Sequence, residues 1–197
     1  MNKVSFRTFL LCALLATVPL TGCTALAIGG VAAGGLAITD RRTVGAQTDD
    51  QTMEMAIKSQ SMSYFKQKGS AHSTVSATSY NRNILLTGVV ANEEEKQAIE
   101  RLARAQASVK EVYNYITVGG AYTMSVKDAW ITSKVRTVLL NPKGFSPNQI
   151  KVVTYNGVTY VMGILTPAEQ NAVNHEISTT TGVQKVVTLY ETFESQQ

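Results

Sequence analysis

The chain has 197 residues, of which 44% are hydrophobic, and a formal net charge of +4. Without a leader of 22 residues, the length allows one medium domain or two small ones. Lys3 and Arg7 belong to that leader, so the remaining charge is only +2, and we expect no nucleic-acid partner.

The first 22 residues have the order of a secretory leader. Lys3 and Arg7 form a positive start, an apolar run follows, and residues 20–23 read Leu-Thr-Gly-Cys. This ending resembles the lipobox of bacterial lipoproteins, whose cysteine receives a diacylglycerol on its sulfur and an acyl group on its amine. The resemblance implies an acylated Cys23 as the first mature residue and no other cofactor. A plain transmembrane helix or a free cysteine is the alternative.

The acylated residue predicts the location of the protein. Several acyl chains, at about 0.8 kcal/mol per buried methylene, give stable attachment to a membrane. Thr24 is not the aspartate that retains enterobacterial lipoproteins in the inner membrane, so we expect the periplasmic face of the outer membrane. Cys12 lies in the leader. With Cys23 acylated, we expect no disulfide and no cysteine-based metal or catalytic site. Residues 23–48 are expected to form a Gly/Ala-rich linker.

The rest of the chain contains an internal repeat. Alignment of Gly88 with Gly163 sets an offset of 75 residues, at which neighbouring positions agree in type. The matching pairs are Val75 with Ile150, Tyr80 with Tyr155, Asn81 with Asn156, Leu86 with Val161, and Glu94 with Glu169. Agreement over so long a stretch indicates a duplicated unit.

Each copy predicts the element order α-β-β-α-β. Core-facing positions of the first helix recur near helical spacing, at Met53, Ala56, Ile57, Gln60 and Tyr64 in one copy and at Ile131, Val135, Val138 and Leu139 in the other. Two alternating strands follow, and a β-branched strand closes each unit at residues 109–118 and 183–190. This order predicts an α+β fold in which a three-stranded mixed sheet packs on two helices. Because each unit has only about 70 residues, we expect the two units to pack on one another.

Several residues suit backbone with positive φ. Asn156 and Gly157 predict a tight hairpin turn, where the first copy has the less suitable residues 81–83. Gly182 suits the left-handed end of a helix, and Ser108 stands at the matching place in the first copy.

The second helix of each copy begins with clear signals. Thr166 is predicted as the N-cap, Pro167 as the first helical residue, and Glu169 as the partner that completes a capping box. Asn92 and Glu95 are expected to do the same in the first copy.

At this point the pattern resembles the BON domain, a bacterial secreted domain linked to osmotic stress and to lipid association. The resemblance rests on the apolar strand ending in Gly88 or Gly163, the helix after it, and the closing Val-x-x-Val steps. It implies two tandem BON domains, which we place at residues 49–118 and 124–192.

The lipobox and the segments at residues 39–45 and 128–132 make the chain similar to outer-membrane lipoproteins with two BON domains. That similarity implies non-enzymatic work in outer-membrane integrity, enrichment at division sites, and binding of anionic phospholipid by the second domain. It also implies a link to the machinery that assembles outer-membrane β-barrels, so an adaptor for that machinery is the alternative function. The preferred lipid, the oligomeric state and display on the cell surface stay open.

The residues offer no constellation for catalysis. His72 lies in a Ser/Thr-rich loop, and His175 lies on a helix at a non-equivalent position of the repeat, neither in a metal-ligand spacing. Residues 93–95 are three glutamates, but they fill the first turn of a helix, where acids favour the macrodipole. We therefore expect neither an enzyme nor a metal site.

Charge distinguishes the two units. Residues 49–118 hold eight basic and eight acidic residues, whereas residues 126–151 hold five basic residues and one acid. The five are Lys127, Lys134, Arg136, Lys143 and Lys151. This asymmetry predicts that the second unit faces an anionic surface.

Trp130 lies more than a right angle from the core stripe of its helix, and Lys127 and Lys134 flank it. An aromatic ring between lysines suits the headgroup level of a bilayer. We therefore predict lipid contact by Lys127, Trp130, Lys134 and Thr137. In two alternatives, Trp130 packs against the first unit or stacks with a lysine as a cation–π pair.

Overall fold

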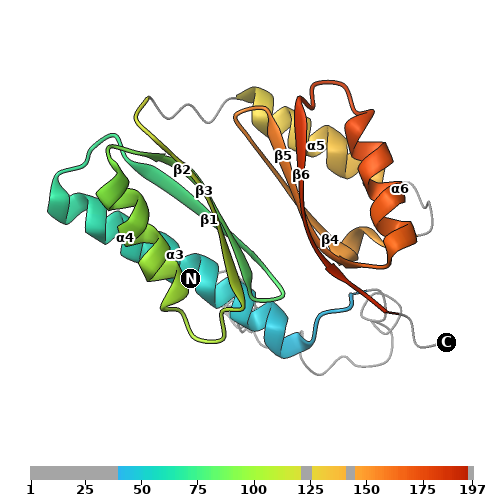
Figure 1. The fold of residues 1–197 in the computed structure, drawn as a ribbon, viewed down its shortest axis with the longest axis horizontal. Helices are drawn as coiled ribbons and strands as arrows, with labels where there is room; N and C mark the ends of the chain where they lie inside the picture. The colour runs from blue at the N-terminus through green and yellow to red at the C-terminus, as the bar shows by residue number, and fades with distance from the viewer. Residues whose placement is uncertain (1–39, 121–125, 141–144, 195–197) are drawn as a thin grey trace, which may run out of the picture. The chain divides into compact units, whose positions relative to one another are not determined.

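The computed structural model describes residues 40–120, 126–140 and 145–194, which belong to one compact unit (Figure 1). The predicted leader, Cys12, Cys23, Thr24 and Lys143 lie outside the described residues. So does most of the predicted linker.

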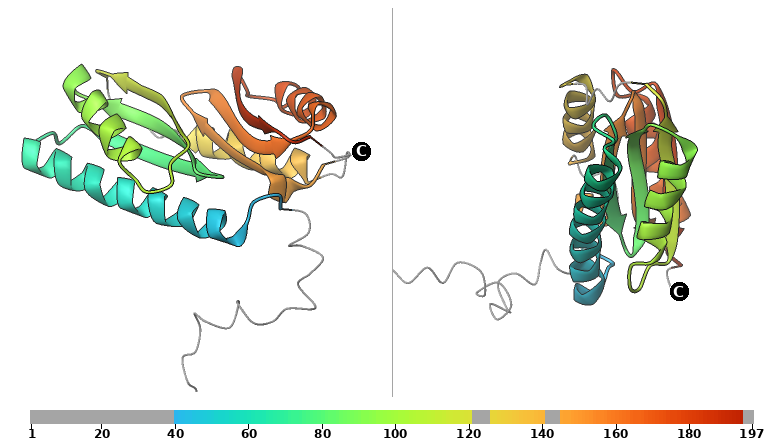
Figure 2. Two further views of the ribbon diagram at one scale, coloured as in Figure 1. Left: turned by 60° about the horizontal axis from the view of Figure 1, so that its bottom comes forward. Right: turned by 90° about the vertical axis from the view of Figure 1, so that its left-hand side faces the viewer.

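The first copy consists of two helices and three strands, in the predicted order. They are α3 (Val44–Lys68), β1 (Thr74–Tyr80), β2 (Asn83–Val90), α4 (Glu93–Arg104) and β3 (Glu111–Val118). The central strand β2 pairs antiparallel with β1 and parallel with β3. A parallel pair needs a crossover, and α4 supplies it. Both α3 and α4 cover the same face of this sheet (Figures 1 and 2).

The second copy repeats this arrangement. Its elements are α5 (Val126–Leu139), a 3₁₀ turn η1 (Pro147–Gln149), β4 (Ile150–Tyr155), β5 (Val158–Leu165), α6 (Pro167–Ser178) and β6 (Lys185–Thr192). The central strand β5 again pairs antiparallel with β4 and parallel with β6. The predicted α+β fold with a mixed three-stranded sheet in each copy is confirmed.

The repeat glycines stand where the edge strand starts. Gly88 of β2 pairs with Val75 of β1, and Gly163 of β5 pairs with Ile150 of β4. A Cβ on Gly88 would lie 2.1 Å from the carbonyl oxygen of Thr74, and one on Gly163 would lie 2.8 Å from that of Gln149. Only glycine leaves room for the neighbouring backbone, which explains why this residue marks both copies.

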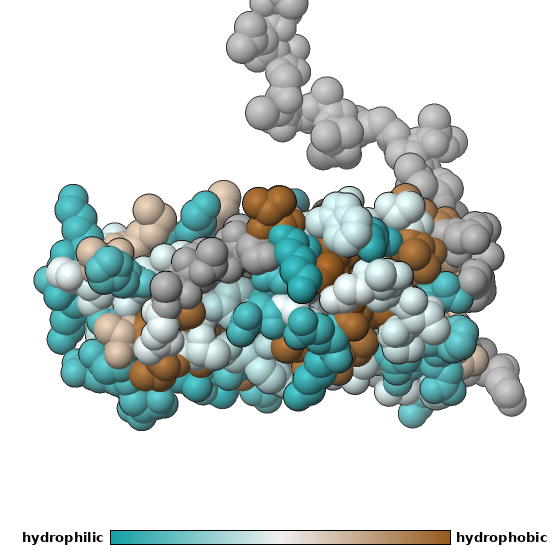
Figure 3. Space-filling model, turned by 90° about the horizontal axis from the view of Figure 1, so that it is seen from above, coloured by the Kyte–Doolittle hydropathy of each residue, from teal (hydrophilic) through white to brown (hydrophobic). Residues whose placement is uncertain are grey.

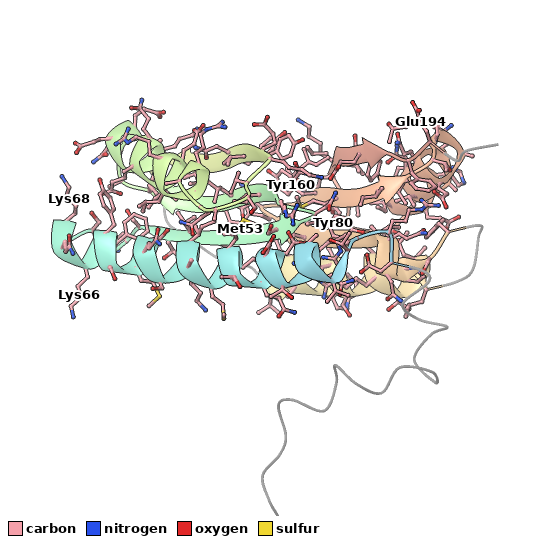
Figure 4. All side chains as sticks on the ribbon, turned by 90° about the horizontal axis from the view of Figure 1, so that it is seen from below. Met53, Lys66, Lys68, Tyr80, Tyr160 and Glu194 are labelled. Atoms are coloured by element: carbon pink, nitrogen blue, oxygen red, sulfur yellow. The ribbon has the colours of Figure 1, made fainter. Side chains whose placement is uncertain are left out.

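The first helix of each copy buries a regular stripe, with some changes from the predicted face. On α3, Met53 and Ile57 are buried as predicted, and Phe65 is buried as well. Gln60 is exposed, so the prediction that it faces the core is wrong. Met53 lies on the sheet side of α3, whereas Lys66 and Lys68 point away at its end (Figure 4). On α5, the predicted Ile131, Val135 and Leu139 are buried and Val138 is half-buried.

Helix α3 begins five residues before the predicted start of the first domain. Thr43 is its N-cap and accepts a hydrogen bond from the amide of Ala46, and Ala46 itself is buried. Composition alone placed residues 44–48 in the linker, because their small and polar side chains show no apolar period.

Both hairpin turns have positive φ at their two central residues, as predicted for Asn156 and Gly157. In the first copy Asn81 and Arg82 occupy these positions, with φ of 52° and 69°. The buried Asp50 of α3 accepts hydrogen bonds from the amides of both residues, at 2.8 and 2.7 Å. This carboxylate fixes a turn that the residue types alone favour weakly.

The second copy has the same device. Asp128 of α5 is buried and accepts hydrogen bonds from the amides of Asn156 and Gly157, both at 2.9 Å. Asp50 and Asp128 therefore hold the same place in the repeat, 78 residues apart, and each joins the first helix to the hairpin. The charge count treated Asp128 only as the single acid of a basic stretch.

The predicted cap of the second helix is confirmed in one copy and partly wrong in the other. Thr166 and Glu169 form a capping box at the start of α6, with Pro167 in the first turn. Asn92 caps α4, but the Glu95 side chain does not return to its backbone. Glu95 instead accepts from the Ala91 amide and the hydroxyls of Ser70 and Ser73, because the loop after α3 lies beside it.

The predicted helix ends also differ. Gly182 and Ser108 do have positive φ, 104° and 65°. However, α6 ends at Thr179 and α4 at Ala105, both in right-handed conformation. The left-handed residues lie in the loops beyond and turn the chain towards the last strand.

The faces of the sheets that the helices leave open meet in a third apolar cluster. Its buried members come from both copies: Tyr80, Leu85, Tyr160, Met162, Ile164 and Leu189. Polar contacts surround it, since Lys151 of β4 pairs with Glu54 of α3 at 2.5 Å and Glu191 of β6 accepts from Asn81 and Asn83. The two copies pack on one another, as their small size predicted.

Two consecutive arginines before α3 bind different copies. Arg41 donates to the Ile164 carbonyl and makes a bidentate ion pair with Glu169, in the second copy. Arg42 pairs with Asp40 and with the buried Asp50 of the first copy. Residues 40–43 thus form a strap between the two copies, at the point where the chain arrives from its N-terminal segment.

Candidate functional site

Helix α5 places Trp130 on the side opposite its buried stripe. The residues Asp128, Ile131, Val135 and Leu139 face the core, and Trp130 is 56% exposed. The alternative in which Trp130 is buried against the first copy is therefore wrong.

The cation–π alternative is confirmed. The Nζ atom of Lys134 lies 3.4 Å from the centroid of the Trp130 ring. The same ammonium donates a hydrogen bond of 3.0 Å to the carbonyl of Thr181, in the loop after α6. Lys134 thus joins α5 to this loop and holds a positive charge against the indole at the protein surface.

Two further apolar side chains share the outward face of α5. Val126 is 88% exposed and Leu140, directly after the helix, is 65% exposed. At about 100° per residue, Val126, Trp130 and Leu140 lie within about 80° of one another around the helix axis. Sequence reasoning missed the first and last of these, although their spacing of four and ten residues carried the signal.

A groove of about 420 Å³ runs between α5 and the residues that follow α6. Trp130, Lys134 and Thr137 line it, so the structure brings together three of the four predicted lipid-binding residues. Lys127 is exposed, one turn before Trp130, and does not line the groove. The opposite wall is formed by Glu176 and residues 179–181, which sequence reasoning did not single out.

The basic surface is smaller than the charge count predicted. Lys151 is held by Glu54 at 2.5 Å and also donates to the Ser79 carbonyl, both in the first copy. Arg136 donates to the carbonyl of Val152. Lys143 lies outside the described residues. Lys127 and Lys134 are therefore the basic side chains that remain beside Trp130.

Apolar residues on the surface lie in small groups between polar ones, as Figure 3 shows for one face. Among the described residues, no helix is long and apolar enough to cross a bilayer. Contact through α5 would therefore be contact with the membrane interface.

The acidic first turn of α4 has a structural role. Burial by itself raises the pKa of the Glu95 carboxyl, but hydrogen bonds from Ser70, Ser73 and the Ala91 amide outweigh it and lower the pKa below its ordinary value. This carboxylate ties the loop after α3 to the start of α4. Among the described residues, no group of acids, histidines or cysteines is arranged to hold a metal ion.

Comparisons with known proteins agree with the repeat. The model of the BON domain family matches residues 49–120 and again residues 127–190. The outer membrane lipoprotein DolP of Haemophilus influenzae is 34% identical over 178 residues, which cover 89% of this chain and 91% of that protein. The 21 kDa hemolysin of Actinobacillus pleuropneumoniae is 29% identical over 151 residues, or 75% of this chain and 76% of that protein.

Among solved structures, the type III secretion protein CdsD of Chlamydia trachomatis aligns with 73% of this chain and 64% of its own. The identity is 14% and the TM-score 0.31.

Proposed function

The chain belongs to the BON-domain family, and from that premise we propose that it is a non-enzymatic outer-membrane lipoprotein that contacts anionic phospholipid through the outward face of α5. The location rests on the similarity to an outer membrane lipoprotein over 89% of the chain. Cys23 would carry the acyl chains, and the folded part would stand on the periplasmic face.

The single observation that carries the lipid contact is the exposed Trp130 beside the Lys134 ammonium. An indole ring is stable at the level of lipid headgroups, because its apolar body and its N–H suit that boundary. Val126 and Leu140 extend the apolar surface along the same side of the helix. Lys127 and Lys134 supply the charges that attract anionic headgroups.

The acyl anchor assigns a particular task to this second contact. Several acyl chains already secure the protein to its membrane, so α5 is not needed for attachment. Its contact would instead select the places along the membrane where the protein gathers, such as division sites rich in anionic lipid, and would support envelope integrity there.

Vesicle binding tests the contact. The chain from residue 24 onward, which takes no acyl groups, should sediment with vesicles of phosphatidylglycerol and phosphatidylcholine but not with phosphatidylcholine alone. Trp130→Ala should weaken binding about tenfold or more, since a large buried ring is lost from the interface. Added salt should weaken it further by screening the lysines.

A matched control is Met62→Ala. Met62 is 63% exposed on α3, the corresponding helix of the first copy, and should tolerate substitution without loss of vesicle binding. Equal binding by Trp130→Ala and the unmodified chain would remove α5 as the contact. In cells, a photocrosslinker at position 130 that trapped one protein in place of lipid would favour the adaptor.

A further inference from the structure

The groove between α5 and the end of α6 has two chemically different walls. Trp130 and Lys134 form an aromatic and positive side. Thr179, Thr180 and Thr181 form a side rich in hydroxyl and carbonyl oxygens. The volume, about 420 Å³, is that of a small-molecule pocket rather than of a protein interface.

The hydroxyl groups of this second side are oriented by the helix end. Thr179 donates its hydroxyl proton to the carbonyls of His175 and Glu176, at 3.0 and 3.1 Å. Thr180 donates to the Glu176 carbonyl at 2.8 Å. Across the groove, Thr137 donates to the Ser133 carbonyl at 2.9 Å. Because each hydroxyl has only one proton, these oxygens can offer a ligand only their lone pairs.

The groove therefore combines a site for an anion with a set of hydrogen-bond acceptors. A phosphodiester beside Lys134 would satisfy the first, and hydroxyl groups beyond the phosphate would satisfy the second. The Glu176 carboxylate lines the same groove, and its negative charge disfavours a headgroup that carries a further carboxylate.

We propose that this groove is a headgroup site that selects anionic phospholipids whose headgroup carries hydroxyl groups, as glycerol does, over equally charged headgroups without hydroxyls. The proposal rests on the lipid contact proposed above and adds a specificity to it. Thr137, Thr179 and Thr180 are the residues that set this specificity, whereas Trp130 and Lys134 set the affinity for any anionic surface.

Two lipids with the same charge separate the specificity from the contact. Phosphatidylglycerol and phosphatidylmethanol are both phosphodiesters with one negative charge, and only the first has headgroup hydroxyls. The chain from residue 24 onward should bind vesicles of phosphatidylglycerol about fivefold more tightly than vesicles with an equal fraction of phosphatidylmethanol, as the loss of one net hydrogen bond predicts.

The double substitution Thr137→Val and Thr179→Val should abolish this difference and leave binding to phosphatidylmethanol unchanged. Both residues are exposed, and valine keeps their shape. Thr48→Val is the matched control, because Thr48 is an exposed residue of α3 whose hydroxyl donates to the Val44 carbonyl in the same way. It should keep the fivefold preference.

The outcomes distinguish the two proposals. Equal affinity for the two lipids, with binding still lost in Trp130→Ala, would overturn the headgroup site and leave the lipid contact standing. No binding to either lipid would overturn the lipid contact itself. Soluble glycerol 1-phosphate should not displace the protein from vesicles, and efficient displacement would reassign the groove to a free phosphate ester.

Discussion

Helices α3 and α5 are equivalent elements of the two copies, and their outward faces differ. Both carry exposed apolar side chains, such as Met55 and Met62 on α3 and Trp130 on α5. Beside α3, Gln60 accepts a hydrogen bond from Gln106 in the loop after α4, at 3.1 Å. Beside α5, the corresponding space is the groove lined by Trp130.

The comparison teaches that the two copies share their framework and diverge in the layer above it. The repeat glycines and the buried aspartates of the first helices recur because the sheet and hairpin require them. The outward residues meet no such requirement, so one copy was free to acquire an aromatic ring, a lysine and a row of hydroxyls. The predictions below first break the shared framework and then the differences.

The largest effect is expected at the repeat glycines. Gly88→Ala should lower the free energy of unfolding by about 3 kcal/mol or more, because the new Cβ would meet the Thr74 carbonyl oxygen at 2.1 Å and φ is 140°. Gly163→Ala, with 2.8 Å to the Gln149 carbonyl, should cost about 1–3 kcal/mol. Urea unfolding measures both. Gly45→Ala is the control, since its nearest neighbour lies at 3.9 Å, and it should not destabilise.

The buried aspartates come next. Asp50→Asn should cost about 2–3 kcal/mol, because Asp50 accepts from two turn amides and also pairs with Arg42. Asp128→Asn should cost less, since Asp128 serves a turn whose glycine adopts positive φ without strain. Thermal unfolding of the two variants compares them. A larger loss in Asp128→Asn would contradict this account of the first hairpin.

Acid should affect the strap as well. Burial raises the pKa of the Glu169 carboxyl, but hydrogen bonds from Arg41 and Thr166 outweigh it, so its pKa in the folded protein lies below the ordinary 4.5. A lowered folded pKa stabilises the protein above the unfolded pKa. This contribution is lost as the pH falls below 4.5 and through the folded value.

The variant Glu169→Gln should therefore be less stable at neutral pH and lose less stability on acidification than the unmodified chain. The measurement is urea unfolding across this pH window, with Glu176→Gln as control, since Glu176 lies on the same helix away from the strap. Parallel pH profiles for Glu169→Gln and the unmodified chain would show that the strap contributes no pH-dependent stability.

Local patterns were sufficient to predict the elements. The offset between Gly88 and Gly163, the turn at Asn156 and the cap at Thr166 depend on residues near one another in the sequence. The same holds for the outward position of Trp130, which follows from helical spacing.

The remaining features depend on residues far apart in the sequence. Lys151 was counted as part of a basic surface because its partner Glu54 lies 97 positions away. The role of Asp50 depends on a hairpin 31 residues later, and the groove exists only because the chain after α6 returns to α5. No local pattern carries such information, so the site was predicted as one face of a helix without its second wall.

The most direct test of the lipid contact uses the fact that Trp130 is the only tryptophan of the chain. Its fluorescence reports on this one ring. On addition of phosphatidylglycerol vesicles, the emission should shift to the blue, and lipids brominated on their acyl chains near the headgroup should quench it. Emission that stays unchanged while the protein sediments with the vesicles would contradict the account, because the membrane would then be held by another surface.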